Sequence, residues 1–298
     1  MVKQTPGGYN GKNLFNHLAL RLANTRTRNK RGGNRLDRFL NVATRAAYQA
    51  GEFLLNNLYK ASQIHYKGEG HFNPQSLADK GAEDIIVNSI SDAFPNHSFI
   101  SEERGEIDTP SDYTWVIDPL DGTINFIHKY HYFAVSIALL YREDVMLGAV
   151  YNPLVDEMFT AVKGNGAHLN NRRIQTSTTA NLDKSLLAMG FPYDRNSEAF
   201  SRSTKNFVCL LRESQAIRRD GSTALDLCNV ACGRYDGFCI AGNPIWDYAA
   251  GSLIVTEAGG KITDFEGNPF HVKNNNNEVL ATNGKTHDII LKCFAEVK

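Results

Sequence analysis

The sequence lacks the features of a membrane-bound, secreted or zinc-finger protein. No apolar run approaches the roughly 18 residues that a membrane-spanning helix needs. The chain opens Met-Val-Lys-Gln-Thr-Pro-Gly-Gly without the apolar core of a secretory signal, so we expect a cytoplasmic protein with no membrane partner. Its 298 residues hold only five cysteines and no Cys-x-x-Cys pair. That usage favours free buried thiols in a reducing compartment over a zinc site.

Net charge is absent too, because 32 Lys and Arg balance 32 Asp and Glu. The balance argues against a protein whose whole surface holds nucleic acid. It hides an uneven distribution, since residues 1–36 carry eight basic side chains and no acidic one. We expect residues 1–35 to form a basic, flexible N-terminal arm and residues 36–298 to form the folded domain. A transit peptide and a tail that binds RNA or a protein are the alternatives for the arm.

Hydrophobic periodicity predicts a layered α+β fold. Helical spacing of apolar residues is found over residues 36–59, 79–94, 198–213, 221–232 and 246–258 and near the C-terminus. Strand patterns are found over residues 98–101, 114–117, 132–141, 145–151, 157–162, 185–189, 261–265 and 278–282. Residues 142–144 and 170–171 are typical hairpin connections, which indicates mostly antiparallel strands. These elements form two blocks, which predicts sub-domains of about 36–183 and 184–298 that share one interface.

The richest motif is Trp-Val-Ile-Asp-Pro-Leu-Asp-Gly-Thr, residues 115–123. An apolar strand delivers Asp118 and Asp121, and the proline between them keeps Asp118 extended. Gly122 and Thr123 then open a turn whose N–H groups suit an anion such as phosphate. Two carboxylates beside such a turn fit a site in which Mg²⁺ lies between acid and phosphate. The ordinary alternative is a turn in which Asp121 caps its own backbone.

Three further acidic segments lie at the ends of predicted elements. Glu102 and Glu103 follow a strand, Asp247 lies in the first turn of a helix rich in small residues, and Asp79 begins another helix. Taken singly, the glutamates read as solvated surface charge, and the two aspartates read as partners of helix N-termini.

Taken together, these segments resemble the inositol monophosphatase family of lithium-sensitive, Mg²⁺-dependent phosphatases. WVIDPLDGTINF and WDYAAGSLIVTEAGG match the two signatures of that family, and LDRFLNVATRAAYQAGEFLL, FISEE and RRDGSTALDL are also similar to it. The resemblance covers Leu36 to the C-terminus. It implies an α-β-α-β-α layered fold, a homodimer, inhibition by lithium, and hydrolysis of a small phosphorylated metabolite such as inositol 1-phosphate.

The resemblance also implies roles for individual residues. Glu102, Asp118 and the Leu120 carbonyl would bind a first Mg²⁺, and Asp118, Asp121 and Asp247 a second, while a third ion would rest on Glu102 and water. Asp79 and Thr123 would form the polar network around the attacking water, with Glu103 behind the metal ligands. Substrate contacts would come from Gly122 and Thr123 at the phosphate and from Asp121, Gly221, Ser222, Thr223 and Asp247. Clamped cations neutralise a phosphate monoester, so no Ser, Cys or His nucleophile is needed.

One position departs from the family pattern. Seven residues before the second-motif Asp, the inositol phosphatases usually carry a Glu that contacts ring hydroxyls, and here Ile240 stands in that place. Asn243 or a partner chain then supplies the contact, or the substrate is different. Histidinol phosphate, a sugar bisphosphate and a nucleotide 3′-phosphate are the alternatives. A regulatory protein that binds RNA or transcription partners through residues 1–36 is an alternative of a different class.

Overall fold

The structure is a computed structural model that describes residues 35–60, 64–66, 74–273 and 277–296. The predicted basic arm lies outside the described residues except for Arg35, the first residue of helix α2 (Arg35–Asn57). Among the described helices, none is both long enough and apolar enough to cross a bilayer.

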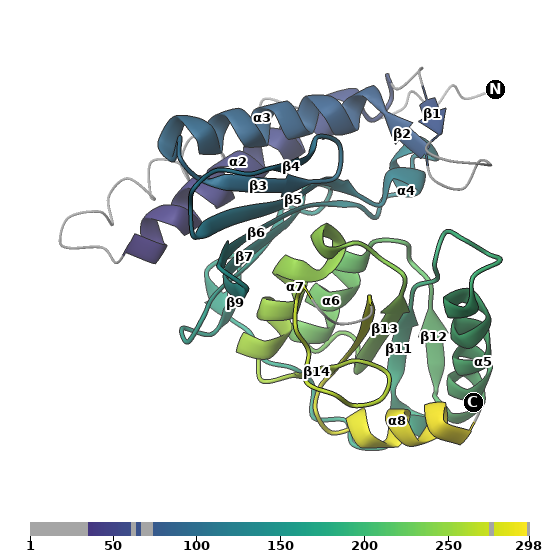
Figure 1. Ribbon diagram of the computed structural model, residues 1–298. Coiled ribbons are helices and arrows are strands. Elements are labelled where there is room, and N and C mark those ends of the chain that lie inside the picture. Colours follow the sequence, from purple (N-terminus) through teal and green to yellow (C-terminus); the bar gives the residue numbers. More distant parts are fainter. Residues whose placement is uncertain (1–34, 61–63, 67–73, 274–276, 297–298) are drawn as a thin grey trace, which may run out of the picture.

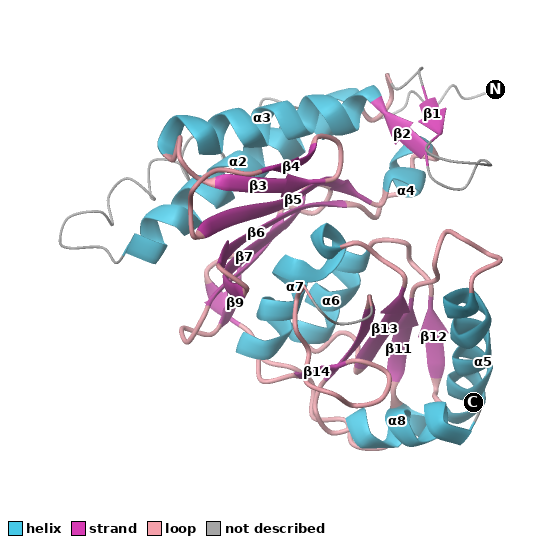
Figure 2. Cartoon of the chain, viewed as in Figure 1, coloured by secondary structure: helices cyan, strands magenta, loops and turns pink. Residues whose placement is uncertain are grey.

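Helices and sheets alternate in five layers (Figures 1 and 2). Helices α2 and α3 (Leu77–Ala93) cover the outer face of an eight-stranded sheet. Helices α6 (Thr223–Ala231) and α7 (Ile245–Glu257) lie between that sheet and a five-stranded one. Helices α5 (Glu198–Glu213) and α8 (His287–Glu296) cover the far face of the second sheet. The predicted α-β-α-β-α arrangement is confirmed.

The eight-stranded sheet has the order β10-β9-β8-β7-β6-β5-β3-β4. Its inner strand β5 (Tyr113–Asp121) runs parallel to β3 (Ser98–Ser101) and antiparallel to β6 (Ala134–Tyr141). The remaining strands are β4 (Gly105–Ile107), β7 (Asp144–Asn152), β8 (Glu157–Val162), β9 (Ala167–Leu169) and β10 (Arg172–Arg173). Strand β5 is paired at both edges and covered on both faces, so its carboxyl end lies inside the protein rather than at its rim.

The five-stranded sheet has the order β12-β11-β13-β15-β14. Its strands are β11 (Leu186–Met189), β12 (Ala216–Arg218), β13 (Gly237–Ala241), β14 (Lys261–Thr263) and β15 (Glu278–Thr282). Most strand pairs are antiparallel, as we predicted, and strand β11, which is parallel to both of its neighbours β12 and β13, is an exception. Strand β12 was missed because three residues are too few to show a period of two.

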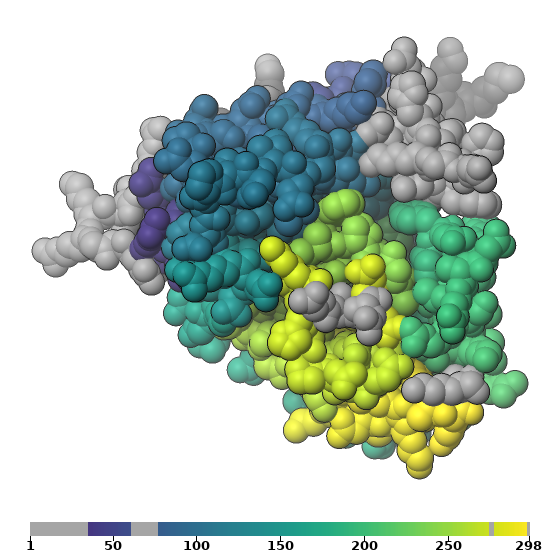
Figure 3. Space-filling view, in the orientation of Figure 1, coloured from purple at the N-terminus to yellow at the C-terminus, as the bar shows by residue number. Residues whose placement is uncertain are grey.

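Small elements complete the fold. Strands β1 (Ile64–Tyr66) and β2 (Pro74–Ser76) pair with each other, α4 (Thr123–Ile127) follows β5, and η1 (Leu182–Lys184) precedes β11. The predicted hairpin at residues 170–171 is confirmed, because Leu169 pairs with Arg172 and both asparagines have positive φ. The space-filling view shows the blue and teal first half of the chain in contact with the yellow-green second half on the visible face (Figure 3).

Helix α7 contacts both sheets, and two glycines let it pack closely against strand β7 and helix α6. Gly148 of β7 has no side chain, and a Cβ placed there would lie 2.6 Å from the carbonyl oxygen of Ala250. On the side of α6, a Cβ at Gly251 would lie 2.6 Å from Cδ1 of Leu227. Both separations are shorter than van der Waals contact permits. A larger residue at either position would therefore displace α7.

The cysteine prediction was wrong for one pair. Cys209 of α5 and Cys293 of α8 form a disulfide with a Cα–Cα distance of 6.3 Å, within the usual range. Cys228, Cys232 and Cys239 are free, as predicted. The bonded residues are separated by 84 positions, and only the side-by-side packing of α5 and α8 on the outer face brings them together.

Candidate active site

The end of β5 places Asp118 and Asp121 on the same face of the sheet. Asp118 lies opposite Ser136 and Asp121 opposite Ala134, so β5 has one more residue than β6 over this stretch. That bulge matters because residues three apart on a regular strand point to opposite faces. Both carboxylates consequently face the α6–α7 layer, and both residues are buried.

Asp121 is bound by the N-terminus of α6. The Ser222 hydroxyl and the Ala224 N–H both donate to Asp121 Oδ2, the latter at 2.7 Å, and the Thr223 N–H donates to Oδ1 at 3.2 Å. Burial raises the pKa of Asp121 to about 6, while the donors Ser222, Ala224 and Thr223 act in the opposite direction. A buried carboxylate that collects three donors is held in one orientation, ready to ligate a cation with its remaining lone pairs.

Asp118 lies at the centre of a group of like charges. Its Oδ1 accepts the Leu120 N–H at 3.0 Å. Burial raises its pKa well above the usual range, and the negative charges of Glu102, Asp121 and Asp247 raise it further. The four carboxylates expected as metal ligands, which come from β5, from the turn after β3 and from α7, therefore lie close enough for their charges to repel one another.

Asp247 is carried by the first turn of α7 but does not cap it. The residue at the cap is Pro244, which makes no side-chain cap hydrogen bond. Instead, the Asn243 amide donates to Asp247 Oδ2 and also lies 3.3 Å from Thr223 Oγ1. Asp247 is therefore not the N-cap of α7, although its place in the first turn still suits the helix dipole, and its Oδ2 is held by Asn243.

Asp79 and Thr123 are in direct contact. The Thr123 hydroxyl lies 3.1 Å from Asp79 Oδ1 and 3.1 Å from the Leu120 carbonyl oxygen, and its single proton is donated to one of them at a time. Asp79 comes from the first turn of α3, and both side chains are buried. The network that the sequence predicted around these two residues has its hydrogen bond in place.

Glu102 and Glu103 lie close to Asp79. Carboxylate oxygens of Asp79, Glu102 and Glu103 all fall within 4.8 Å of one another, a spacing that can hold a metal ion. Glu83 of α3 fixes this turn, since its Oε1 accepts the Glu103 N–H at 3.0 Å and its Oε2 pairs with Arg104 at 3.4 Å. Sequence reasoning missed Glu83, although it lies one helical turn after Asp79 on the same face.

Gly122 allows the turn after Asp121 to pack closely against its neighbours. Its φ is 98°, and a Cβ there would lie 3.1 Å from the Tyr132 carbonyl oxygen and 3.2 Å from that of Gly221. The Asn125 amide joins the same two segments, donating to the carbonyl oxygens of Tyr132 and Asp220 at 2.7 Å each. The 121–123 turn and the start of α6 are thereby held against each other.

The donor set fits a small divalent cation. Its side-chain ligands are carboxylates and its backbone candidate is the Leu120 carbonyl, the hard oxygen donors that Mg²⁺ prefers. The mutual repulsion that raises the pKa of Asp118 is what a bound cation relieves.

Some of the positions expected to contact the substrate adjoin the acidic site, and one of them offers it no polar atom. Ser222 and Thr223 adjoin the site, yet their best-defined contacts are the hydrogen bonds to Asp121. Ile240 is buried under the segment that follows β11, where its Cδ1 lies 2.2 Å from the position that a Cβ on Gly190 would take. It therefore offers the site no polar atom.

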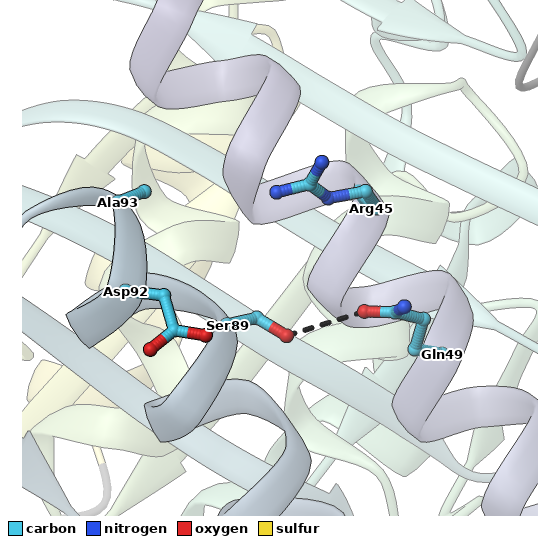
Figure 4. Close-up of a pocket in the computed structure, with 5 residues that line it drawn as sticks. All are labelled: Arg45, Gln49, Ser89, Asp92 and Ala93. Carbon is cyan, nitrogen blue, oxygen red and sulfur yellow. Dashed lines mark hydrogen bonds between the residues drawn. The ribbon is translucent and has the colours of Figure 1, made fainter.

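A pocket on the outer surface lies apart from these groups. It is bordered by α2 and α3 and lined by Arg45, Gln49, Ser89, Asp92 and Ala93 (Figure 4). Ser89 donates to Gln49 across it at 3.2 Å. Its α3 residues lie at least ten positions beyond Asp79, roughly 15 Å along the helix, so it does not belong to the acidic site.

Comparison with known proteins agrees with this geometry. The model of the inositol monophosphatase family matches residues 35–298. The chain belongs to the inositol monophosphatase family. Inositol-1-monophosphatase of Synechocystis sp. is 42% identical over 263 residues, which cover 87% of this chain and 90% of that protein. Members of the family hydrolyse phosphoric monoesters with the help of metal ions, and this chain is a phosphoric monoester hydrolase.

Two further proteins are similar to this chain. Nus factor SuhB of Escherichia coli K12 is 43% identical over 230 residues, which cover 76% of this chain and 85% of that protein. The structure of inositol monophosphatase from Anabaena (Nostoc) sp. PCC 7120 superposes with a TM-score of 0.79 at 38% identity, covering 89% of this chain and 98% of that one. Residues 1–34 lie outside the family match.

Proposed function

We propose that this protein hydrolyses a small phosphate monoester with Mg²⁺ as cofactor and a water molecule as nucleophile. The observation that carries the proposal is that Glu102, Asp121 and Asp247 all lie close enough for their charges to raise the pKa of the buried Asp118 carboxyl. Glu102, Asp118 and the Leu120 carbonyl would hold one ion, and Asp118, Asp121 and Asp247 another. When bound, Mg²⁺ supplies Lewis-acid chemistry, acidifying water and stabilising the leaving oxygen.

The protein's own residues orient the reacting groups. The Thr123 hydroxyl donates a hydrogen bond to the buried Asp79 or to the Leu120 carbonyl, and in either case its oxygen lone pairs stay available to a water molecule. The same contact keeps Thr123 at the start of α4, where the N–H groups of Gly122 and Thr123 are candidates to bind the phosphate. Glu103 stands beside Glu102 and is held by Glu83, which fixes the orientation of the pair.

The test is phosphate release from a panel of four substrates with Mg²⁺ or with a chelator. The panel consists of inositol 1-phosphate, histidinol phosphate, a sugar bisphosphate and a nucleoside 3′-phosphate. We expect Mg²⁺-dependent release that lithium inhibits. Asp121→Asn should lower kcat by about 100-fold or more, because it weakens several kcal/mol of charge stabilisation.

Asp288→Asn is the matched control, because that aspartate is exposed and paired only with Lys261 among the contacts described. It should leave release unchanged. Equal activity of Asp121→Asn and the wild type, or equal rates with and without chelator, would exclude the proposed mechanism. A homodimer is part of the proposal, and its mass in solution can be measured by light scattering.

A second candidate function is regulatory. It is favoured by the similarity to proteins named Nus factor SuhB and by the eight basic residues in positions 1–36. We propose that this basic segment contacts RNA or transcription partners. Removing residues 1–34, which leaves α2 intact, should abolish salt-sensitive RNA retention and spare phosphate release. Equal retention by the shortened chain would rule this function out.

A further inference from the structure

Helix α6 is bonded to the first half of the chain at a second point, beyond its hydrogen bonds to Asp121. The Tyr132 hydroxyl donates to Asp226 Oδ1 at 2.8 Å, and the Asn229 amide donates to the Tyr132 hydroxyl oxygen at 2.8 Å. Tyr132 lies between α4 and β6, whereas Asp226 and Asn229 are buried and lie three residues apart on one face of α6. One hydroxyl therefore joins two side chains of α6 to the segment that precedes β6.

Arg234 determines the direction of each hydrogen bond in this network. Its guanidinium donates to Asn229 Oδ1 at 3.2 Å and to Glu157 of β8 at 2.7 Å. Because a guanidinium can only donate, Asn229 must offer its NH₂ group to Tyr132. The single Tyr132 proton is then directed at Asp226. Removal of the Tyr132 hydroxyl would take away a partner from a buried donor and from a buried acceptor.

The backbone of Tyr132 is bonded to α4, the helix that follows the 121–123 turn. The Tyr132 carbonyl oxygen accepts the Asn125 amide at 2.7 Å, and Asn125 lies two residues after Thr123. The same amide donates to the Asp220 carbonyl at 2.7 Å, just before α6. Tyr132 thus reaches α4 through its carbonyl and α6 through its hydroxyl.

These contacts bear on Asp121 because they act on the helix that orients it. The Asp226 N–H donates to the Ser222 carbonyl at 3.0 Å, so the carboxyl bonded to Tyr132 lies one helical turn from the N-cap of α6. Two of the three donors to Asp121 are backbone N–H groups of that first turn, and they point along the helix axis. Apolar packing is non-directional, whereas hydrogen bonds at two points of a helix fix its axis.

We propose that Tyr132 is a positioning residue for Asp121. Through Asp226 and Asn229 its hydroxyl keeps the N-terminus of α6 aimed at the Asp121 carboxylate, and so keeps that carboxylate oriented for Mg²⁺. The inference rests on the metal site of the proposed function, in which Asp121 is a Mg²⁺ ligand. Because Tyr132 acts through α6, loss of its hydroxyl should lower the affinity for Mg²⁺ and spare the chemical step at saturating Mg²⁺.

The test is calorimetric titration of the full-length protein with Mg²⁺, which needs no substrate. The binding event of interest is the one that Asp121→Asn removes. For this event we expect Tyr132→Phe to raise the dissociation constant about three- to tenfold, less than the roughly 10- to 100-fold typical of a group that bonds a metal ligand directly. At saturating Mg²⁺, phosphate release by Tyr132→Phe should stay within about twofold of the wild type.

Tyr151→Phe is the matched control. The Tyr151 hydroxyl also donates to an aspartate, Asp156, at 3.3 Å, but Tyr151 packs against Gly51 of α2, on the face of the sheet opposite to α6. Both variants should lower the midpoint of chemical denaturation, because each loses a hydrogen bond to a carboxylate. Only Tyr132→Phe should also bind Mg²⁺ more weakly, which a merely structural role would not produce.

Asp226 supplies a second pair of variants. Asp226→Asn and Asp226→Ala both remove the carboxylate, but only the asparagine keeps an oxygen that can accept the Tyr132 proton. Mg²⁺ binding should therefore be weakened more by the alanine than by the asparagine. This comparison tests the inference independently of Tyr132→Phe.

The outcomes separate the two proposals. A wild type that binds Mg²⁺ but releases phosphate from no substrate overturns the proposed hydrolysis, and the binding comparisons still decide the role of Tyr132. An active wild type whose Tyr132→Phe variant binds Mg²⁺ as tightly as Tyr151→Phe does overturns the inference alone. Equal Mg²⁺ affinities of Asp226→Asn and Asp226→Ala would do the same, and so would a large loss of kcat in Tyr132→Phe at saturating Mg²⁺.

Discussion

The hydrogen bond from Ser222 to Asp121 leads to a quantitative prediction. Ser222 is the N-cap of α6, accepting the Leu225 N–H at 3.4 Å, and its hydroxyl also donates to the buried Asp121 carboxylate. Ser222→Ala removes both. Loss of an N-cap costs about 1 kcal/mol, and loss of a bond to a charged group about 1.5–3 kcal/mol. We expect the free energy of unfolding to fall by about 3 kcal/mol.

Ser197→Ala provides the reference, because Ser197 caps α5 in the same way and accepts the Phe200 N–H at 3.1 Å. Its predicted cost is about 1 kcal/mol. Ser222→Thr keeps the hydroxyl and should restore most of the stability. Chemical denaturation in the presence of a chelator measures all three variants.

Mg²⁺ binding should distinguish the two caps as well. Asp121 loses one of its three donors in Ser222→Ala, and loss of a group that orients a ligand typically weakens metal affinity about 10- to 100-fold. The Mg²⁺ concentration for half-maximal phosphate release should rise accordingly in Ser222→Ala and not in Ser197→Ala. Equal stability losses in both variants, together with equal Mg²⁺ requirements, would refute the reasoning that Ser222 serves Asp121.

Three further predictions concern other parts of the molecule. Burial lowers the pKa of His287 to about 4 from its usual 6.5. Stability that is present above pH 6.5 is therefore lost as the pH falls toward 4, by about 3 kcal/mol. Denaturation of His287→Gln should lack this pH dependence of the free energy of unfolding. Thr123→Val breaks the contact with Asp79 and should lower kcat about 100-fold while calorimetry finds Mg²⁺ affinity nearly unchanged. Reduction of the Cys209–Cys293 disulfide should cost about 2–4 kcal/mol, and thiol titration of the unfolded chain should count three thiols before reduction and five after.

Local patterns were enough to predict which segments form the layers and which acids stand at their ends. Helix α5 and strand β8 have the predicted boundaries because each carries its full period within one segment. Asp118 and Asp121 were predicted from one motif in which two acids lie close together in the sequence, whereas Asp247 was assigned only through the family resemblance.

The face of the sheet to which these acids point, and the orientation of their carboxylates, depend on long-range interactions that no local sequence pattern shows. A bulge in β5, visible only in its pairing with β6, puts Asp118 and Asp121 on one face. Asp121 is oriented by Ser222, about a hundred residues away, where sequence reasoning expected a substrate contact. The sequence analysis made no prediction for Glu83, which accepts the Glu103 N–H and so fixes the turn after Glu102. Partners this far apart become visible only once the layers have packed.

The close packing of α7 gives two residues an influence out of proportion to their size. Gly148 allows α7 to pack closely on β7, Gly251 allows it to pack closely on α6, and α7 carries Asp247, whose charge acts on Asp118 of β5. Positions 148 and 251 therefore influence where Asp247 lies relative to the carboxylates of β5, although neither residue belongs to the acidic site. A methyl group added at either position would displace α7, and Asp247 with it, without altering any ligand.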